Sequence, residues 1–129
     1  MAAAELAIVR VRPFLPSKDF AASKRFYIEL GFSIRFEDAN LAIMALGDAG
    51  FLLQNFYVKD WADNFMIQLM VPDLDAWWRH ISSLNLAAKY GVRPPTAPKL
   101  EPWGNRVTYL WDPAGVLWHV TEANQPADS

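Results

Sequence analysis

Residues 101–122 run EPWGNRVTYLWDPAGVLWHVTE, and this stretch decides the fold class. Two short segments rich in β-branched and aromatic residues, 106–111 and 116–122, flank the quartet Asp112-Pro113-Ala114-Gly115. Pro113 presets φ for the second position of a tight turn, and Gly115 adopts a conformation that costs other residues more free energy. The stretch therefore predicts a β-hairpin, which the chain enters through Trp103-Gly104.

The composition bounds what the hairpin can belong to. The chain has 129 residues, of which 53% are hydrophobic and 20% charged, so we expect a single globular domain over residues 1–129. A net charge of −2 without a cluster of basic residues argues against a nucleic-acid partner. No cysteine is present, which excludes disulfides and thiolate ligands. No long apolar run or basic leader occurs, so we expect a cytoplasmic protein without a membrane partner.

Outward from the hairpin, one order of elements occurs twice. The first half predicts strands at 6–15, 32–37, 41–46 and 51–57, with a helix that begins at Ser17 or Asp19 and ends at Gly31. The second half predicts strands at 65–71, 86–90, 106–111 and 116–122, with a helix at 73–84. An offset of 54 superposes the helices and an offset of 65 superposes the last hairpins; the four-proline segment 92–103 is an extended loop that makes up the difference. We predict an α+β fold of two β-α-β-β-β modules, about 6–60 and 64–123, which form a cupped, eight-stranded mixed sheet with helices outside.

Several motifs carry a resemblance to a known family. The segment FYIELGF (26–32), the pair Trp103-Gly104 and the quartet at 112–115 resemble the vicinal-oxygen-chelate superfamily, which contains glyoxalase I, extradiol dioxygenases and bleomycin resistance proteins. The similarity runs from about residue 14 to 122. The entry LPSKDF (15–20), and QNF (54–56) where others carry a metal-binding Glu, make the bleomycin resistance proteins the most similar group. The resemblance implies paired modules, a cupped sheet and commonly a homodimer.

The resemblance also implies where a metal would lie. Enzymes of the superfamily hold a divalent cation with four residues, and the matched positions fall near Arg12, with a slip of one or two residues left open, and at Gln54, Met66 and His119. Arg has no lone pair to donate, Met is a poor ligand for Zn²⁺, Mn²⁺ or Fe²⁺, and Gln offers only a neutral carbonyl. His119 alone is a strong ligand, whereas a catalytic zinc needs about three. We therefore expect no metal and no cofactor.

Without a metal the cup is an aromatic groove suited to binding. Alternate strand residues share a face, so Tyr109 and Trp111 lie together, while Trp118 faces opposite to His119 and belongs to the core. The resemblance implies that Trp103 contributes to a drug groove and that Trp61 lies in a linker used at the dimer interface. The predicted ligand-binding residues are Phe36, Phe56, Trp61, Trp103, Gly104, Tyr109, Trp111 and His119.

These observations favour a metal-independent homodimer that binds and sequesters a small aromatic or cationic molecule, such as a bleomycin-type antibiotic. Acidic residues that could attract a basic ligand are Asp38, Asp60 and Asp63, and the same residues also fit ordinary solvated loop charges. The alternative is a divergent lyase or isomerase of the superfamily with non-standard site residues. A third class is a dimerising module without a ligand. Glu122 and Asp48 are available for acid–base chemistry, but nothing singles them out, so we assign no catalytic residue.

Overall fold

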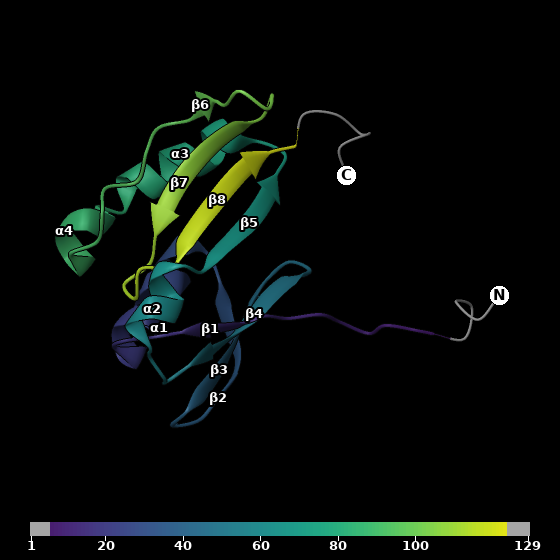
Figure 1. Ribbon diagram of the computed structural model, residues 1–129, viewed down its shortest axis with the longest axis vertical. Coiled ribbons are helices and arrows are strands. Elements are labelled where there is room, and N and C mark those ends of the chain that lie inside the picture. The colour runs from purple at the N-terminus through teal and green to yellow at the C-terminus, as the bar shows by residue number, and fades with distance from the viewer. Residues whose placement is uncertain (1–5, 124–129) are drawn as a thin grey trace.

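The strands form two four-stranded sheets in the computed structural model, which describes residues 6–123 (Figure 1). The first sheet has the order β1-β4-β3-β2 and the second the order β5-β8-β7-β6. In each sheet the first strand of the module runs parallel to the last and the other pairs are antiparallel, so both sheets are mixed. The strands are β1 (Phe14–Pro16), β2 (Ser33–Glu37), β3 (Leu41–Leu46), β4 (Ala49–Gln54), β5 (Met66–Val71), β6 (Lys99–Leu100), β7 (Arg106–Trp111) and β8 (Leu117–Glu122).

The predicted α+β class and the paired modules are confirmed, with the eight strands divided between two sheets. One long helix covers each sheet, α1 (Phe20–Leu30) on the first and α3 (Leu74–Ser83) on the second. Both helices begin in the same way: the side chain of Asp19 accepts a hydrogen bond from Ala22 N (3.1 Å), and that of Asp73 from Ala76 N (3.0 Å). Each cap satisfies a backbone donor that the first turn leaves unpaired.

A buried aromatic cluster joins the two modules. Trp118 of β8 is only 2% exposed, and its ring lies 5.7 Å from both Tyr27 of α1 and Phe51 of β4, measured between centroids. Trp118 Nε1 donates to the hydroxyl of Tyr27 (2.9 Å), and that hydroxyl donates to Asp112 Oδ2 (2.5 Å). Burial raises the pKa of the Asp112 carboxyl to about 6. The expectation that Trp118 belongs to the core is confirmed.

Three predicted segments differ from the structure. Residues 86–90, predicted as a strand, form the helix α4 (Leu86–Tyr90), because a short apolar run has no decisive period and Ala87, Ala88 and Lys89 favour a helix. The linker between the modules contains the short helix α2 (Lys59–Asp63). The proline-rich loop includes the two-residue strand β6, which pairs with β7.

The first strand is much shorter than predicted. Only three residues pair with β4, and residues 6–13 continue as an extended segment that runs away from the body of the molecule (Figure 1). We call residues 6–13 the N-terminal arm. It exposes Leu6, Ile8, Val9 and Val11, with Val9 93% exposed. Across residues 6–123, no helix has the length and apolar character needed to cross a membrane.

Candidate binding site

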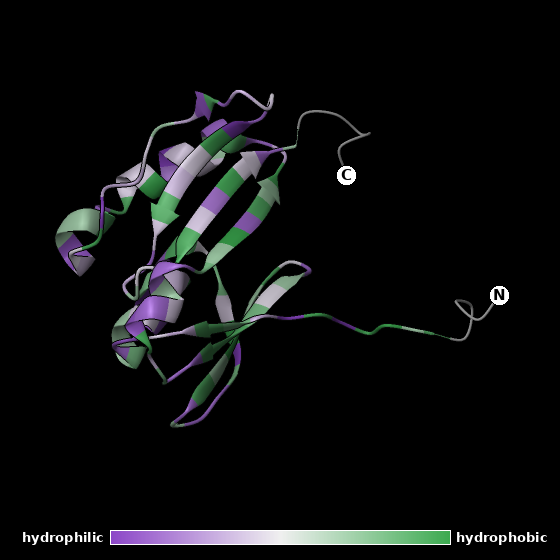
Figure 2. Ribbon diagram, in the orientation of Figure 1, coloured by the Kyte–Doolittle hydropathy of each residue, from purple (hydrophilic) through white to green (hydrophobic). Residues whose placement is uncertain are grey.

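Each sheet has one face that its helix leaves open. In the second sheet α3 lies behind the strands, and the near faces of β5, β8 and β7 are uncovered (Figure 1). Hydrophilic residues interrupt the hydrophobic ones in each of these strands (Figure 2), and fully buried positions alternate with partly exposed ones from Leu117 to Val120 of β8. We call this uncovered surface the second open face and its counterpart on the first sheet the first open face.

The strand register places three of the predicted residues on the second open face. His119 pairs with Tyr109 on one side and with Gln68 on the other, and in the next row Leu117 pairs with Trp111 and Met66. Tyr109, Trp111 and His119 therefore form a continuous surface with two residues of β5. Gln68 was missed in the sequence, although its spacing of two from Met66 could have indicated it.

His119 and Tyr109 are in direct contact. Their ring centroids are 5.0 Å apart in an edge-on arrangement. The Tyr109 hydroxyl donates to Glu101 Oε2 (2.6 Å), and this bond, together with burial, raises the pKa of Tyr109 to about 12. His119 Nε2 is buried and has no hydrogen-bond partner within residues 6–123, so the face retains one unused polar atom.

Trp103 lies at the tip of the β6–β7 hairpin. Gly104 N donates to Glu101 O (2.9 Å), and Glu101 N donates to Asn105 O (2.9 Å), which closes a tight turn. Gly104 has a φ of 101°, a conformation that a side chain would strain, so the glycine is required by the turn. The turn holds Trp103 outward with 61% of its surface exposed. Glu101 links the turn to β7, because its side chain accepts the hydrogen bond from the Tyr109 hydroxyl.

The remaining predicted residues belong to the first module and its linker. Phe36, Ile43, Leu52 and Phe14 form one row across the first open face, and Phe36 is about half exposed. Phe56 and Trp61 pack together with ring centroids 6.3 Å apart, beside a small apolar pocket of about 130 Å³. The eight predicted residues thus fall on two open faces, a linker pair and a hairpin tip, and their role in ligand binding stays a prediction.

Trp111 lies at the end of the second open face, where it borders a larger cavity. This cavity has a volume of about 660 Å³ and lies between α2, the 112–115 turn and residues 91–93. The guanidinium carbon of Arg93 lies 4.8 Å from the centroid of the Trp111 ring. Neither Arg93 nor Lys18, which also lines the cavity, was singled out in the sequence, because isolated basic residues in loops carry no pattern.

The metal positions can be tested on the strand register. Phe14 pairs with Leu52 and Met66 pairs with Leu117, and 52 and 117 differ by the offset of 65. The counterpart of Met66 in the first module is therefore Phe14, at an offset of 52, which lies two residues from Arg12 and within the slip left open there. The helix caps keep an offset of 54, because Asp19 follows Phe14 by five positions whereas Asp73 follows Met66 by seven.

The corrected set is poorer in donors than the predicted one, since Phe14 has no atom that can bind a cation. Gln54, Met66 and His119 complete it, and only His119 is a strong ligand. Within residues 6–123 no three His, Asp or Glu side chains come together in a way that could hold an ion. The residues at the superfamily's metal positions do not fit a divalent metal.

The acidic residues considered in the sequence are mostly engaged elsewhere. Asp38 Oδ1 accepts from the backbone N–H of Asn40 and Leu41 within a turn. Asp63 pairs with Lys59 at 2.6 Å between Oδ2 and Nζ. Glu122 contacts Arg106 at 3.1 Å, which leaves it paired rather than poised as a general base.

Comparison with known proteins places this geometry in a family context. The sequence profile described as the Glyoxalase/Bleomycin resistance protein/Dioxygenase superfamily matches residues 7–120. A bleomycin resistance protein of Klebsiella pneumoniae is 34% identical over 115 residues, covering 85% of this chain and 89% of the relative.

Two solved structures extend the similarity to three dimensions. A bleomycin-binding protein in complex with bleomycin has a TM-score of 0.78 at 30% identity, covering 91% of this chain and all of the other. The bleomycin-binding protein of the bleomycin producer Streptomyces verticillus, in complex with copper(II)-bleomycin, has a TM-score of 0.74 at 26% identity, covering 92% and 99%.

Proposed function

Because the chain belongs to the Glyoxalase/Bleomycin resistance protein/Dioxygenase superfamily, we propose that it binds and sequesters a planar or cationic antibiotic of the bleomycin type. The observation that carries the proposal is a superfamily fold whose metal positions hold only one strong ligand, His119, while its open face is aromatic. This combination favours binding over metal-assisted catalysis. Its relatives of similar length include proteins that bind bleomycin.

The aromatic residues supply the physical basis for affinity. A flat heteroaromatic or cationic group against an indole or phenol ring gains about 0.5–2 kcal/mol per contact. Micromolar affinity requires about 8 kcal/mol, so several rings must act together. Trp103, Tyr109 and Trp111 can contribute from one module, and Trp103 is the residue with the largest free surface among them.

The proposal includes a homodimer, because one chain does not assemble the predicted residues in a single pocket. The N-terminal arm exposes four large apolar side chains, and both open faces expose further ones, including Phe36, Met66 and Met70. Contiguous apolar surface of this kind is typical of an association surface. A second copy would cover the arm and bring a first open face and a second open face together, which would complete a groove.

The binding test is fluorescence titration with metal-free bleomycin in buffer that contains EDTA. We expect tryptophan quenching with a dissociation constant in the micromolar range or below, unchanged by the chelator. Trp103→Ala should weaken binding about five- to thirtyfold, because an exposed ring contact worth about 1–2 kcal/mol is lost. Trp103→Phe, which keeps a ring, is the matched variant and should recover part of the affinity.

Two outcomes contradict the proposal. Absence of quenching at millimolar bleomycin removes the bleomycin-type ligand, and a stoichiometric divalent ion that depends on His119 removes the metal-independent mode. The dimer is tested separately by sedimentation of the full chain and of a chain that lacks residues 1–12. A full chain that stays monomeric at micromolar concentration rules the dimer out. The cytoplasmic location stays a prediction from the sequence.

A further inference from the structure

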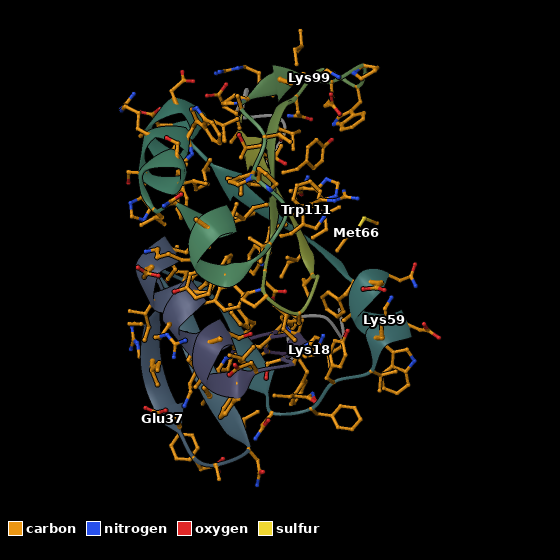
Figure 3. All side chains as sticks on the ribbon, turned by 90° about the vertical axis from the view of Figure 1, so that its left-hand side faces the viewer. Lys18, Glu37, Lys59, Met66, Lys99 and Trp111 are labelled. Atoms are coloured by element: carbon orange, nitrogen blue, oxygen red, sulfur yellow. The ribbon has the colours of Figure 1, made fainter. Side chains whose placement is uncertain are left out.

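The cavity of about 660 Å³ between the two modules has a chemistry unlike that of the aromatic open faces. We call it the inter-module cleft. It lies at the junction of the modules, with Lys18 on the side of the first and Trp111 on the side of the second, and Met66 beside them (Figure 3). Its volume is within the range of about 300–1,000 Å³ that is usual for small-molecule sites.

Two cations line the cleft without a carboxylate partner. Within residues 6–123, neither Lys18 nor Arg93 has an Asp or Glu oxygen at ion-pair distance. Each lies against an aromatic ring instead: Lys18 Nζ is 5.7 Å from the centroid of Tyr57, and Arg93 Cζ is 4.8 Å from that of Trp111. A ring face restrains a cation and leaves its N–H donors unused.

The acidic residues of the cleft do not neutralise these cations. Asp63 is paired with Lys59 at 2.6 Å. Asp112 is buried, and it accepts from the Tyr27 hydroxyl and from the backbone N–H of Ala114 and Val116. Asp112 is only 1% exposed, so the exposed charges of the cleft that lack an ion-pair partner within residues 6–123 are those of Lys18 and Arg93, although the chain as a whole carries −2.

Apart from the charged residues, Tyr57 and Asn64, the lining consists of apolar residues and glycines. It includes Met66, Val92, Pro113, Ala114 and Leu117, and Met66 is 63% exposed. Two isolated cations are too few for a nucleic-acid surface, which needs many phosphate contacts. The apolar wall, the Arg93 guanidinium and the Lys18 ammonium instead suit a small organic molecule with an acidic group. The planar guanidinium matches the two oxygens of a carboxylate or phosphate.

We propose that the inter-module cleft binds a small organic anion, with a carboxylate or phosphate held by Arg93 and Lys18 and an apolar body against Met66 and Leu117. This site shares Trp111 and Met66 with the second open face, but it is defined by Arg93 and Lys18 and does not depend on Trp103. The ligand would contact both modules, because Lys18 precedes α1 and Arg93 follows α4.

The test compares three probes that share one ring system: 2-naphthoate, 2-naphthyl phosphate and the uncharged 2-naphthamide. Binding to the full chain is measured by calorimetry, and the site is located by NMR from the indole N–H of Trp111, assigned with Trp111→Phe. At low salt we expect both anions to bind at least about tenfold more tightly than the amide, and added salt to reduce only the binding of the anions. Relative affinity for the two anions distinguishes a carboxylate ligand from a phosphate ligand.

Matched variants decide whether the cleft is responsible. Arg93→Gln and Lys18→Gln should each lower the preference for the anions about three- to tenfold, and the double variant should abolish it. Arg79→Gln removes an exposed cation of α3 outside the cleft and should change nothing, and Trp103→Ala should also leave anion binding intact. Equal affinity for naphthoate and naphthamide, or loss of anion binding in Trp103→Ala alone, would overturn the proposal.

Discussion

The strands β1 and β5 occupy equivalent places in the two modules but are used differently. β5 pairs with β8 over six residues, from Met66 to Val71. β1 pairs with β4 over only three residues, and the chain before it forms the exposed N-terminal arm. The second module thus completes its own sheet, whereas the first leaves its leading apolar segment uncovered.

The two modules have the same order of elements, but only the second covers its leading apolar segment within its own sheet. In the second module the leading strand buries Val71 in the core. In the first module β1 buries Leu15 in the core, but the arm before it leaves Leu6, Ile8, Val9 and Val11 exposed. We therefore expect mutations in the two regions to report on different equilibria, namely unfolding for the second and association of chains for the first.

The largest expected effect on the free energy of unfolding tests whether the two modules share one core. Trp118→Ala removes a buried side chain that contacts Tyr27 and Phe51, and we expect a loss of about 3–5 kcal/mol in the free energy of unfolding. Urea denaturation of the purified chain measures it. Trp103→Ala is the control, with an expected cost below about 0.5 kcal/mol. Similar costs for the two variants would contradict the assignment of Trp118 to the joint between the modules.

The joint should also respond to pH. In the folded protein the pKa of the Asp112 carboxyl is about 6, above the ordinary value of 3.8. Protonation of Asp112 therefore stabilises the folded state, and this stabilisation is complete below about pH 4 and is lost as the pH rises through 6. The loss amounts to about 3 kcal/mol, since each pKa unit corresponds to about 1.4 kcal/mol. Urea denaturation between about pH 4 and pH 7 should show this dependence in the natural chain and lack it in Asp112→Asn. Asp48→Asn, on an exposed turn, is the control. If Asp112→Asn keeps the full pH dependence, another group causes it.

The contrast between the leading segments is tested by two equal truncations. Val71→Ala should lower the free energy of unfolding by about 2 kcal/mol at any protein concentration, because Val71 is buried. Val9→Ala should leave unfolding of the single chain nearly unchanged and weaken the association of chains instead. Denaturation at two protein concentrations separates these effects. An equal, concentration-independent loss in both variants would contradict an uncovered arm.

The smallest effect is predicted to be the same in both modules. Asp19→Ala and Asp73→Ala each remove one N-cap hydrogen bond and should each cost about 1 kcal/mol. Thermal or urea unfolding measures both. Asp19→Asn and Asp73→Asn, which keep the accepting oxygen, should restore most of the loss. A cost confined to one helix would show that the modules are capped unequally.

The sequence predicted the repeated fold well because its signals are local. Asp19, Gly31 and Asp73 mark helix ends through backbone hydrogen bonds, and the 112–115 turn fixes a hairpin. The helix α4 was missed because five residues are too few to show a period. The length of β1 could not be predicted either, since pairing depends on a partner strand rather than on the apolar residues of the segment itself.

The candidate site was harder to predict than the fold. Strand alternation correctly grouped Tyr109, Trp111 and His119 and placed Trp118 in the core. The inter-module cleft gave no signal, because Lys18 and Arg93 are 75 positions apart in the sequence and line the same cavity only in the folded chain. The two-residue slip at Arg12 arose because the helix offset of 54 was applied to the first strands, whose offset is 52.

The bond between Trp118 and Tyr27 also constrains how the molecule is made. These residues are 91 positions apart, and Asp112 is 85 positions from Tyr27. On the ribosome, the first module emerges long before its core can receive the Trp118 indole, so its aromatic cluster stays incomplete until nearly the whole chain has been synthesised. Contacts of such long range slow folding, because the chain must close a large loop before it gains the contact. The first module therefore exposes apolar surface until Trp118 has been added and can pack, which favours recognition of the nascent chain by chaperones.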